Sequence, residues 1–342
     1  MQMGKLSLSF LIAIALAGCT ASSSLQKQIY KTTGVVEKTE PMLDAIIAPG
    51  TNAEIIAEGL HWSEGPVWIE KQQMLLFSDV RTNTVYKWTA KKGKEIYLVP
   101  SGYTDTMKRG GEMGSNGLTT DNNDNLVLCQ HGNRQMARMD APLNKPAAKF
   151  TAIASHFNGK KFNSPNDAVY NSKGTLFFTD PPYGLQTQND NDPKKELPFN
   201  GVYKVGRDGK VVLLIDSITR PNGLAFFPGE KKLIIANSDP AKPYWYLYDV
   251  GDDDVLKNGT IFYSAAAAMR RGTFGLPDGL KIDKKGHVFA TGPGGVWIFN
   301  SDATLLGKIK LTGPASNCAF SANEKTLFVT NDMNVLRIQL KN

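Results

Sequence analysis

A polar residue followed by a short apolar run recurs six times along this chain of 342 residues. The polar residue is an amide or a carboxylate, and about ten positions later comes an apolar run of β-type residues, such as the one from Leu176 to Phe178. The six polar positions are Glu64, Asn116, Asn166, Asn222, Asp278 and Asn317. Short strands that repeat at intervals of about 40–50 residues are typical of a β-propeller with one blade per repeat. The pattern therefore predicts an all-β chain folded as a six-bladed propeller.

Each polar position is expected at the start of the first strand of its blade. In the fifth repeat, the period-two alternation of a strand places Asp278 and Leu280 on one face, and a turn containing Gly and Asp leads to the second strand. The same position of every blade should then face the centre of the ring. The last repeat is short of strands, so the segment 53–59 is expected to complete it and remove the open edge. The loop 186–200 and the stretch 265–271 are candidates for the rim of a central site.

The start of the chain resembles a bacterial secretion signal. A basic residue, Lys5, precedes an apolar run over 6–17, which predicts a signal peptide over residues 1–18. The run is too short to cross a membrane, since a spanning helix needs about 20 apolar residues. The run ends in Leu-Ala-Gly followed by Cys19, an ending that resembles the bacterial lipobox, so Cys19 is expected to be lipidated. The alternative is an ordinary cleaved signal with a chance cysteine.

The region after the signal is polar and lacks strand alternation, which predicts a lipidated N-terminus and flexible tether over residues 19–49. The propeller is then expected over residues 50–342. Thr20 follows Cys19 where an aspartate would favour retention in the inner membrane. By resemblance to bacterial lipoproteins, this predicts a periplasmic protein held by its lipid at the outer membrane.

Composition excludes several classes of function. The net charge is +7, but the basic residues are dispersed rather than gathered with aromatic residues on one face, so no nucleic-acid partner is expected. Cys129 and Cys318 lie in apolar strand contexts of different repeats and are expected to be buried thiols. The sequence has no Cys and His cluster of zinc-finger spacing, no Gly-x-Ser-x-Gly elbow and no Gly-x-Gly-x-x-Gly fingerprint. The missing serine elbow disfavours a serine esterase, and the missing glycine fingerprint disfavours a nicotinamide enzyme.

Four of the repeated positions could form one cation site. Glu64 and Asp278 supply carboxylates, and Asn166 and Asn222 supply amides, at the same phase of four repeats. Oxygen ligands of this kind suit a hard divalent cation. We expect Ca²⁺, although Mg²⁺, Mn²⁺ or Zn²⁺ could also bind. Taken singly, an Asn-Gly or Asp-Gly pair is commonly only a turn. Their shared phase favours a common site at the centre of the ring.

Several motifs together resemble the SMP-30/gluconolactonase/luciferin-regenerating-enzyme family of six-bladed propellers, over about residues 55–340. The motifs are Glu-Gly-Pro-Val-Trp from Glu64, Phe-Asn-Ser-Pro-Asn-Asp from Phe162, Phe-Thr-Asp-Pro-Pro-Tyr-Gly from Phe178, Arg-Pro-Asn-Gly-Leu-Ala-Phe from Arg220 and Leu-Pro-Asp-Gly-Leu-Lys-Ile-Asp from Leu276. The form of the second and third motifs is similar to that of bacterial gluconolactonases.

The resemblance implies roles for individual residues. Glu64, Asn222 and Asp278 would bind a divalent metal, and Asp278 would also be the general base. Asn166 would be a direct ligand or act through water and substrate. Animal members of the family have an arginine that contacts the sugar lactone at the position of Ser164, so the animal type of substrate contact is not expected here.

Three further residues are candidates for substrate binding. The segment that begins at Val127 and contains His131 resembles a second-blade motif of bacterial members, so His131 is expected to line the pocket. A His131 that only hydrogen-bonds neighbouring loops is the alternative. Asn116 and Tyr183 are expected to line the pocket on the same reasoning, and Tyr183 could equally serve packing.

These parts predict a metal-dependent lactonase, a carboxylic ester hydrolase that opens sugar lactones. The cation would polarise the lactone carbonyl, and Asp278 would accept a proton from the attacking water. Two alternatives remain at this point. The same site could hydrolyse phosphotriesters, or the propeller could bind a sugar or a protein without catalysis.

Overall fold

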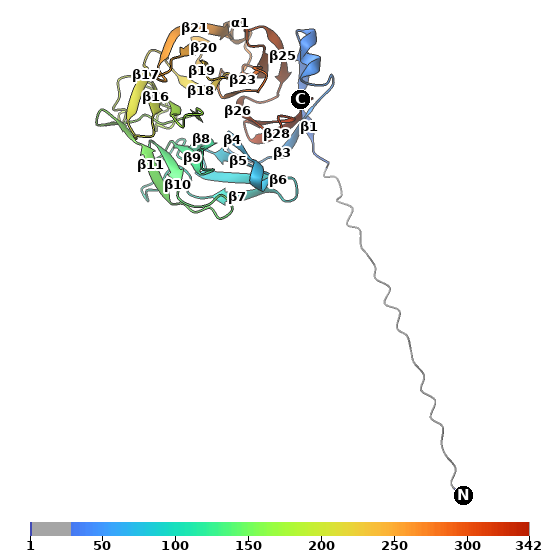
Figure 1. Ribbon diagram of the computed structural model, residues 1–342, viewed down its shortest axis with the longest axis horizontal. Helices are drawn as coiled ribbons and strands as arrows, with labels where there is room; N and C mark the ends of the chain where they lie inside the picture. Colours follow the sequence, from blue (N-terminus) through green and yellow to red (C-terminus); the bar gives the residue numbers. More distant parts are fainter. Residues whose placement is uncertain (2–28, 342) are drawn as a thin grey trace.

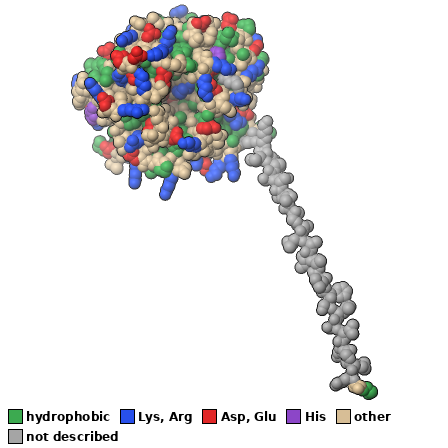
Figure 2. Space-filling model, in the orientation of Figure 1, with side chains coloured by type: hydrophobic (Ala, Val, Ile, Leu, Met, Phe, Trp, Pro, Cys, Tyr) green, Lys and Arg blue, Asp and Glu red, His purple; other side chains and the backbone are tan. Residues whose placement is uncertain are grey.

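The computed structural model describes Met1 and residues 29–341. The strands between Thr32 and Gln339 form a ring of six antiparallel sheets (Figure 1). The prediction of an all-β, six-bladed propeller is confirmed. Among the described residues, no helix is long and apolar enough to cross a membrane. Basic and acidic side chains are interspersed on the face seen in Figure 2, which is hollowed near its centre.

The first three blades each contain four consecutive strands. Blade 1 consists of β4 (Ser63–Ile69), β5 (Met74–Asp79), β6 (Thr84–Thr89) and β7 (Gly93–Leu98), with the 3-10 helix η2 (Glu70–Gln72) between its first two strands. Blade 2 consists of β8 (Ser115–Thr120), β9 (Leu126–Gln130), β10 (Gln135–Met139) and β11 (Phe150–Ala154). Blade 3 consists of β14 (Ala168–Tyr170), β15 (Leu176–Asp180), β16 (Gly201–Val205) and β17 (Val211–Ile215), and it follows the hairpin of β12 (His156–Phe157) and β13 (Lys160–Lys161).

The last three blades complete the ring and take in strands from the N-terminal region. Blade 4 consists of β18 (Pro221–Phe226), β19 (Lys232–Asp239), β20 (Lys242–Val250) and β21 (Leu256–Ser264), and the helix α1 (Ala266–Arg270) follows it. Blade 5 consists of β22 (Leu280–Ile282), β23 (Val288–Gly292), β24 (Gly295–Phe299), β25 (Leu305–Lys310) and β2 (Val35–Lys38). Blade 6 consists of β26 (Ala315–Phe320), β27 (Thr326–Asn331), β28 (Asn334–Gln339), β3 (Ala53–Ala57) and β1 (Thr32–Thr33).

The expected closure of the ring by the segment 53–59 is confirmed. β3 pairs antiparallel with β28, so that Ile55 lies opposite Leu336. A strand from the start of the domain therefore completes the blade formed by the end of the chain, and Figure 1 shows β1, β3 and β28 side by side. The pairing covers an edge of β28 that would otherwise expose unpaired backbone groups.

The flexible tether predicted over 19–49 is wrong for the part of it that the structure describes. β1 pairs with β3, and β2 pairs with β25 of blade 5. The 3-10 helix η1 (Pro41–Ala45) then buries Leu43, and the chain beyond it buries Ile46 and Ile47, each about 1% exposed, in the core between blades 5 and 6. The pairing of this segment could not be seen in the sequence pattern because its strands are short and only three apolar side chains anchor it. Cys19 and residues 2–28, which include most of the predicted signal peptide, lie outside the described residues.

The core is divided into apolar clusters that lie between neighbouring blades. Aromatic rings fill the seam between blades 4 and 5, where the ring centroids of Trp245 and Phe299 are 5.6 Å apart. Cys129 and Cys318 are free, buried thiols, as predicted. This packing fixes each blade against the next and so fixes the inner strands around the axis.

The first strand of each blade lies innermost, and neighbouring first strands contact each other around the ring. In four of the six blades, the glycine after the polar position makes this close approach possible. A Cβ on Gly65 would lie 2.1 Å from the carbonyl oxygen of Asn116, and a Cβ on Gly279 would lie 2.0 Å from Cγ of Asn317. Gly65 lies within a strand, so a hairpin turn does not account for its Glu-Gly pair. The pairing of a polar residue with glycine lets the strands meet around a narrow centre.

Candidate active site

A pocket of about 330 Å³ lies where the inner strands converge. Its volume is at the lower end of the range of about 300–1,000 Å³ for small-molecule sites. Its lining residues are Trp62, Glu64, Glu112, Asn116, Asn166, Tyr183, Asn222, Ser238, Pro240, Met269, Gly275, Leu276, Asp278, Pro314 and Ala315. Six of the seven residues predicted to bind metal or substrate are therefore brought together, while His131 is not among the lining residues.

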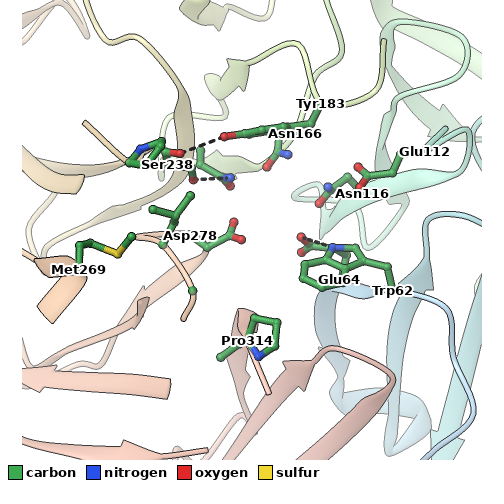
Figure 3. A pocket seen from close by; sticks show the side chains of 15 residues that line it. Trp62, Glu64, Glu112, Asn116, Asn166, Tyr183, Ser238, Met269, Asp278 and Pro314 are labelled. Atoms are coloured by element: carbon green, nitrogen blue, oxygen red, sulfur yellow. Dashed lines mark hydrogen bonds between the residues drawn. The ribbon is translucent and has the colours of Figure 1, made fainter. Parts of the chain in front are cut away.

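Two carboxylates face each other across this pocket. Glu64 lies on β4 and Asp278 lies two residues before β22, and Figure 3 shows their carboxylate groups pointing toward one another. Glu64 is only 4% exposed. Its Oε2 accepts a hydrogen bond of 3.2 Å from the backbone N–H of Gly65, and its Oε1 accepts one of 3.4 Å from Nε1 of Trp62. These donors hold the carboxylate in place on the wall of the pocket.

A buried hydroxyl links the positions of Asn222 and Asp278. Nδ2 of Asn222 donates a hydrogen bond of 2.9 Å to Oγ of Ser238, which in turn donates one of 2.6 Å to the carbonyl oxygen of Pro277. Because the amide nitrogen of Asn222 is used in this way, its oxygen is the atom left to contact a ligand. Ser238 thus joins blade 4 to the residue immediately before Asp278.

The two remaining amides present oxygen atoms with few competing partners. The backbone N–H of Asn166 donates to Thr179 and its carbonyl oxygen accepts from Gly117, at 2.8 Å each, so the main chain is fixed while the side chain faces the pocket. Oδ1 of Asn116 is buried and has no hydrogen-bond partner among the described residues. Buried polar atoms are rarely left unpaired in proteins, so Asn116 is poised to accept a hydrogen bond from a ligand.

The buried carboxylates of the pocket favour the binding of a positive charge. Burial raises the pKa of Glu64 well above its ordinary value, and neighbouring carboxylates, Asp278 first among them, act in the same direction. Burial also raises the pKa of Asp278 well above its ordinary value, and Asp167 and Glu112 contribute. Carboxylates crowded in this way repel one another when ionised, and a bound cation removes that penalty.

The donor set fits a hard divalent cation. Glu64, Asp278, Asn166 and Asn222 present only oxygen ligands, and their two negative charges nearly balance a divalent ion. Residues 29–341 contain no group of three or more His, Cys, Asp or Glu placed to hold a metal, so amide oxygens would have to complete the ligand set.

Polar residues at the ends of second strands position the loops at the rim. The carboxylate of Asp79, the last residue of β5, accepts hydrogen bonds from the backbone N–H groups of His61 (3.1 Å) and Trp62 (3.2 Å). In blade 6, Nδ2 of Asn331 donates a hydrogen bond of 2.9 Å to the carbonyl oxygen of Pro314. Trp62 and Pro314 are thereby fixed as walls of the pocket.

Of the two segments predicted at the rim of the site, one supplies a pocket residue and the other does not. The stretch 265–271 contains α1, which supplies Met269 to the pocket wall. The loop 186–200 supplies none of the lining residues found in the described chain. Tyr183, just before this loop, lines the pocket, and its hydroxyl donates a hydrogen bond of 3.2 Å to the carbonyl oxygen of Ser238.

The sequence analysis missed Glu112 and Ser238. Glu112 lies in the loop between β7 and β8, outside the repeat phase, so no pattern singled it out. Ser238 lies in the second strand of its blade, at the position that Ser78 occupies in blade 1; Ser78 likewise donates a hydrogen bond, of 2.9 Å, to the carbonyl oxygen of Asn116 in the next blade. This second repeat of hydroxyl residues could have been found in the sequence.

His131 and Ser164 lie behind the wall of the pocket. His131 is fully buried, with Nδ1 3.5 Å from Oε2 of Glu112. Ser164 is also fully buried; its Oγ donates to the carbonyl oxygen of Pro181 (2.5 Å) and accepts from the backbone N–H of Gly184 (2.8 Å). Ser164 therefore shapes the loop next to Tyr183 and does not contact the pocket.

Comparison with known proteins agrees with the motifs. The sequence model described as the SMP-30/Gluconolactonase/LRE-like region matches residues 62–332. The chain is 37% identical over 347 aligned residues to a gluconolactonase from Zymomonas mobilis, with 98% of this chain and 96% of that protein covered. This full-length similarity confirms the prediction of an enzyme, a carboxylic ester hydrolase of the lactonase type.

Solved structures show the same architecture. A gluconolactonase from Xanthomonas campestris superposes with a TM-score of 0.77 at 28% identity, covering 92% of this chain and 98% of that chain. The calcium-binding protein regucalcin from Agrobacterium tumefaciens superposes with a TM-score of 0.66 at 15% identity, covering 85% of this chain and 95% of that chain, which shows a shared fold alone. The chain belongs to the SMP-30/gluconolactonase/LRE-like family.

Proposed function

We propose that this protein opens sugar lactones by hydrolysis, using a divalent cation held by Glu64, Asn222 and Asp278 together with Asn166. The observation that carries the proposal is the pair of carboxylates that face each other in the pocket, which the amides of Asn166 and Asn222 also line. Ca²⁺ is the ion we favour because every ligand is an oxygen atom. The full-length similarity to a gluconolactonase supports a sugar lactone as the substrate.

The chemistry assigned to the cation is polarisation of the lactone carbonyl and stabilisation of negative charge on its oxygen. The protein would bind and orient the reacting groups. Glu64 is fixed by Trp62 and Gly65, so its carboxylate has a defined direction. Asn222 is fixed by Ser238, which leaves its amide oxygen for the ligand.

Asp278 would accept the proton of the attacking water. A carboxylate of ordinary pKa is a weak base, but burial and the nearby acidic side chains of Asp167 and Glu112 act to raise the pKa of Asp278. Its carboxylate faces the pocket and points toward that of Glu64. The aromatic ring of Trp62 and the side chain of Met269 would limit the access of other water.

Hydrolysis of D-glucono-δ-lactone tests this proposal. The purified protein should lose activity on chelation and recover it when one of Ca²⁺, Mg²⁺, Mn²⁺ or Zn²⁺ is returned. Asp278→Asn should lower kcat by about 10²–10⁴-fold, the usual contribution of a general base, while the fold is retained by circular dichroism. Activity that survives complete chelation would contradict the role of the cation, and full activity of Asp278→Asn would contradict the base.

The same assay separates the alternatives. Turnover of a phosphotriester without turnover of any lactone would assign the site to the other ester class. Binding of a sugar lactone without hydrolysis, in protein loaded with cation, would indicate a binding propeller.

We also propose that the protein is anchored at the periplasmic side of the outer membrane by a lipid on Cys19. The support is the sequence alone: the short apolar run, the Leu-Ala-Gly-Cys ending and Thr20 after it. Cells grown with an alkyne-labelled fatty acid should label the wild-type protein, and Cys19→Ser should remove the label and release the protein from the membrane fraction. Labelling that persists in Cys19→Ser would contradict this anchor.

A further inference from the structure

A third carboxylate, Glu112, enters the pocket from a loop outside the propeller repeat. It lies between β7 and β8 and is about nine-tenths buried. Figure 3 shows it beside Asn116, on the wall next to Glu64. Oδ1 of Asn116 has no hydrogen-bond partner among the described residues. This wall therefore presents two kinds of hydrogen-bond acceptor side by side: a carboxylate and an unpaired amide oxygen.

A histidine with unpaired nitrogens supports Glu112 from behind. His131 is fully buried, and neither of its ring nitrogens has a hydrogen-bond partner among the described residues. Nδ1 of His131 lies 3.5 Å from Oε2 of Glu112, slightly beyond a good hydrogen bond. Because an unsatisfied buried donor is costly, a small approach of the two groups is favourable. His131 can then donate to the carboxylate and fix its orientation.

The loop that carries Glu112 is tied to the elements behind the pocket. The guanidinium of Arg109 donates a hydrogen bond of 3.0 Å to the carbonyl oxygen of Gly132 and a second to the carbonyl oxygen of Gly184. Gly184 packs so closely that a Cβ on it would lie 2.5 Å from Cβ of His131. The loop, His131 and the segment of Gly184 therefore form one packed unit, which holds Glu112 in the wall.

The chemistry of this wall indicates which groups it can bind. Glu112 adds negative charge to a pocket that already holds Glu64 and Asp278, which is unfavourable unless a bound group compensates the charge. An ionised carboxylate only accepts hydrogen bonds, and so does Oδ1 of Asn116. A ligand that satisfies both must present donors on neighbouring atoms, as the ring hydroxyl groups of a sugar do.

We propose that Glu112 and Asn116 accept hydrogen bonds from neighbouring ring hydroxyl groups of the lactone, and that His131 is a positioning residue that orients the carboxylate of Glu112. This inference rests on the proposed lactonase function and specifies how that site selects a hydroxylated substrate. Glu112 then contributes to selectivity among lactones and is not needed to hold the cation.

Two lactones test the inference by the ratio of their kcat/KM values: D-glucono-δ-lactone, and δ-valerolactone, which has the same ring without hydroxyl groups. Glu112→Gln should lower kcat/KM for the sugar lactone by about 10–100-fold, the loss expected for a hydrogen bond to a charged group. Because Glu112 lines the same pocket as Glu64 and Asp278, kcat/KM for δ-valerolactone should also fall, but by a clearly smaller factor. His131→Phe, which removes the ring nitrogens and keeps an aromatic ring in the core, should change the ratio in the same direction by a smaller factor.

Asp105→Asn is the matched control, because Asp105 carries the same charge in the same loop and is exposed. It should leave the ratio as in the wild type. Calorimetry should show that Glu112→Gln still binds the cation, and both lactones are compared at a cation concentration that saturates each variant. Equal losses for both lactones, no loss for either, or a loss of detectable cation binding in Glu112→Gln would each overturn the inference. A wild-type protein that hydrolyses neither lactone with any cation would instead overturn the proposed function and the inference with it.

Discussion

Ser238→Ala should lower both the affinity for the cation and the stability of the fold, and a matched variant can distinguish the two effects. Oγ of Ser238 accepts from Nδ2 of Asn222 at 2.9 Å and donates to the carbonyl oxygen of Pro277 at 2.6 Å. In Ser238→Ala, the amide of Asn222 loses the partner that directs its oxygen into the pocket. The main chain before Asp278 loses its link to blade 4 at the same time.

The magnitude follows from these two hydrogen bonds. Each contributes about 1 kcal/mol net, so Ser238→Ala should lower the free energy of unfolding by about 2 kcal/mol. The partners of metal ligands typically change cation affinity by about 10–100-fold when they are removed. We expect a loss of cation affinity in this range, because Asn222 can then rotate and Asp278 is less firmly held.

Ser78→Ala provides the matched control. Oγ of Ser78 also makes two buried hydrogen bonds of 2.9 Å, one with Oγ of Ser115 and one to the carbonyl oxygen of Asn116, but it holds no side chain of the proposed ligand set. Urea unfolding of the chelated proteins should show similar losses of stability for both variants. Calorimetric titration with Ca²⁺ should show weaker binding only for Ser238→Ala. Equal cation affinities in the two variants would refute the assignment of Ser238 to the ligand shell.

Three further predictions concern stability and can be measured by urea unfolding. Burial raises the folded-state pKa of Glu64 and Asp278, so the folded protein holds protons that the unfolded chain releases. The chelated protein should therefore lose stability as the pH rises from about 4 toward neutral. Saturating Ca²⁺ should reverse this loss. Gly279→Ala places a Cβ 2.0 Å from Cγ of Asn317 and should cost about 1–3 kcal/mol or more, whereas Gly110→Ala, with no atom within 4 Å, should be neutral. Leu43→Ala should cost about 2–5 kcal/mol because the side chain is buried, while Met42→Ala, at an exposed position, should change stability by less than about 0.5 kcal/mol.

The fold could be predicted from the sequence because a propeller repeats one physical constraint. Each blade needs a first strand that begins beside the axis, so a polar residue and a nearby apolar run return once in every blade, although the spacing is uneven. The closure by β3 followed from the same reasoning, since the last blade lacked a strand. The strands β1 and β2 could not be found in this way. They are edge strands too short for a periodic signal, and β2 in addition pairs with β25, near the other end of the chain.

The site was predictable where it follows the repeat and, for Tyr183, where a family motif marks it. Glu64, Asn166, Asn222 and Asp278 share one phase, so their meeting at the axis follows from the symmetry of the ring. Glu112 comes from a connecting loop, and its place depends on how that loop packs rather than on any period. His131 was expected in the pocket because its segment resembles a second-blade motif of bacterial members of the family. Its ring instead lies fully buried in the turn between β9 and β10, with Nδ1 3.5 Å from Oε2 of Glu112 and outside the lining.

Closure of the ring and assembly of the site depend on the same contacts. Glu64 lies at the start of blade 1, directly beside the blade that β3 completes. Oγ of the preceding Ser63 donates to the carbonyl oxygens of Asp332 (2.9 Å) and Asn334 (2.8 Å), and the carbonyl oxygen of Ser63 accepts a hydrogen bond of 2.7 Å from Oγ of Ser316. The strand of Glu64 is thus held against blade 6 through both the side chain and the main chain of Ser63. If the ring opened at this seam, Glu64 would move away from Asp278, so a cation bound between them should stabilise the closed ring and link binding to folding.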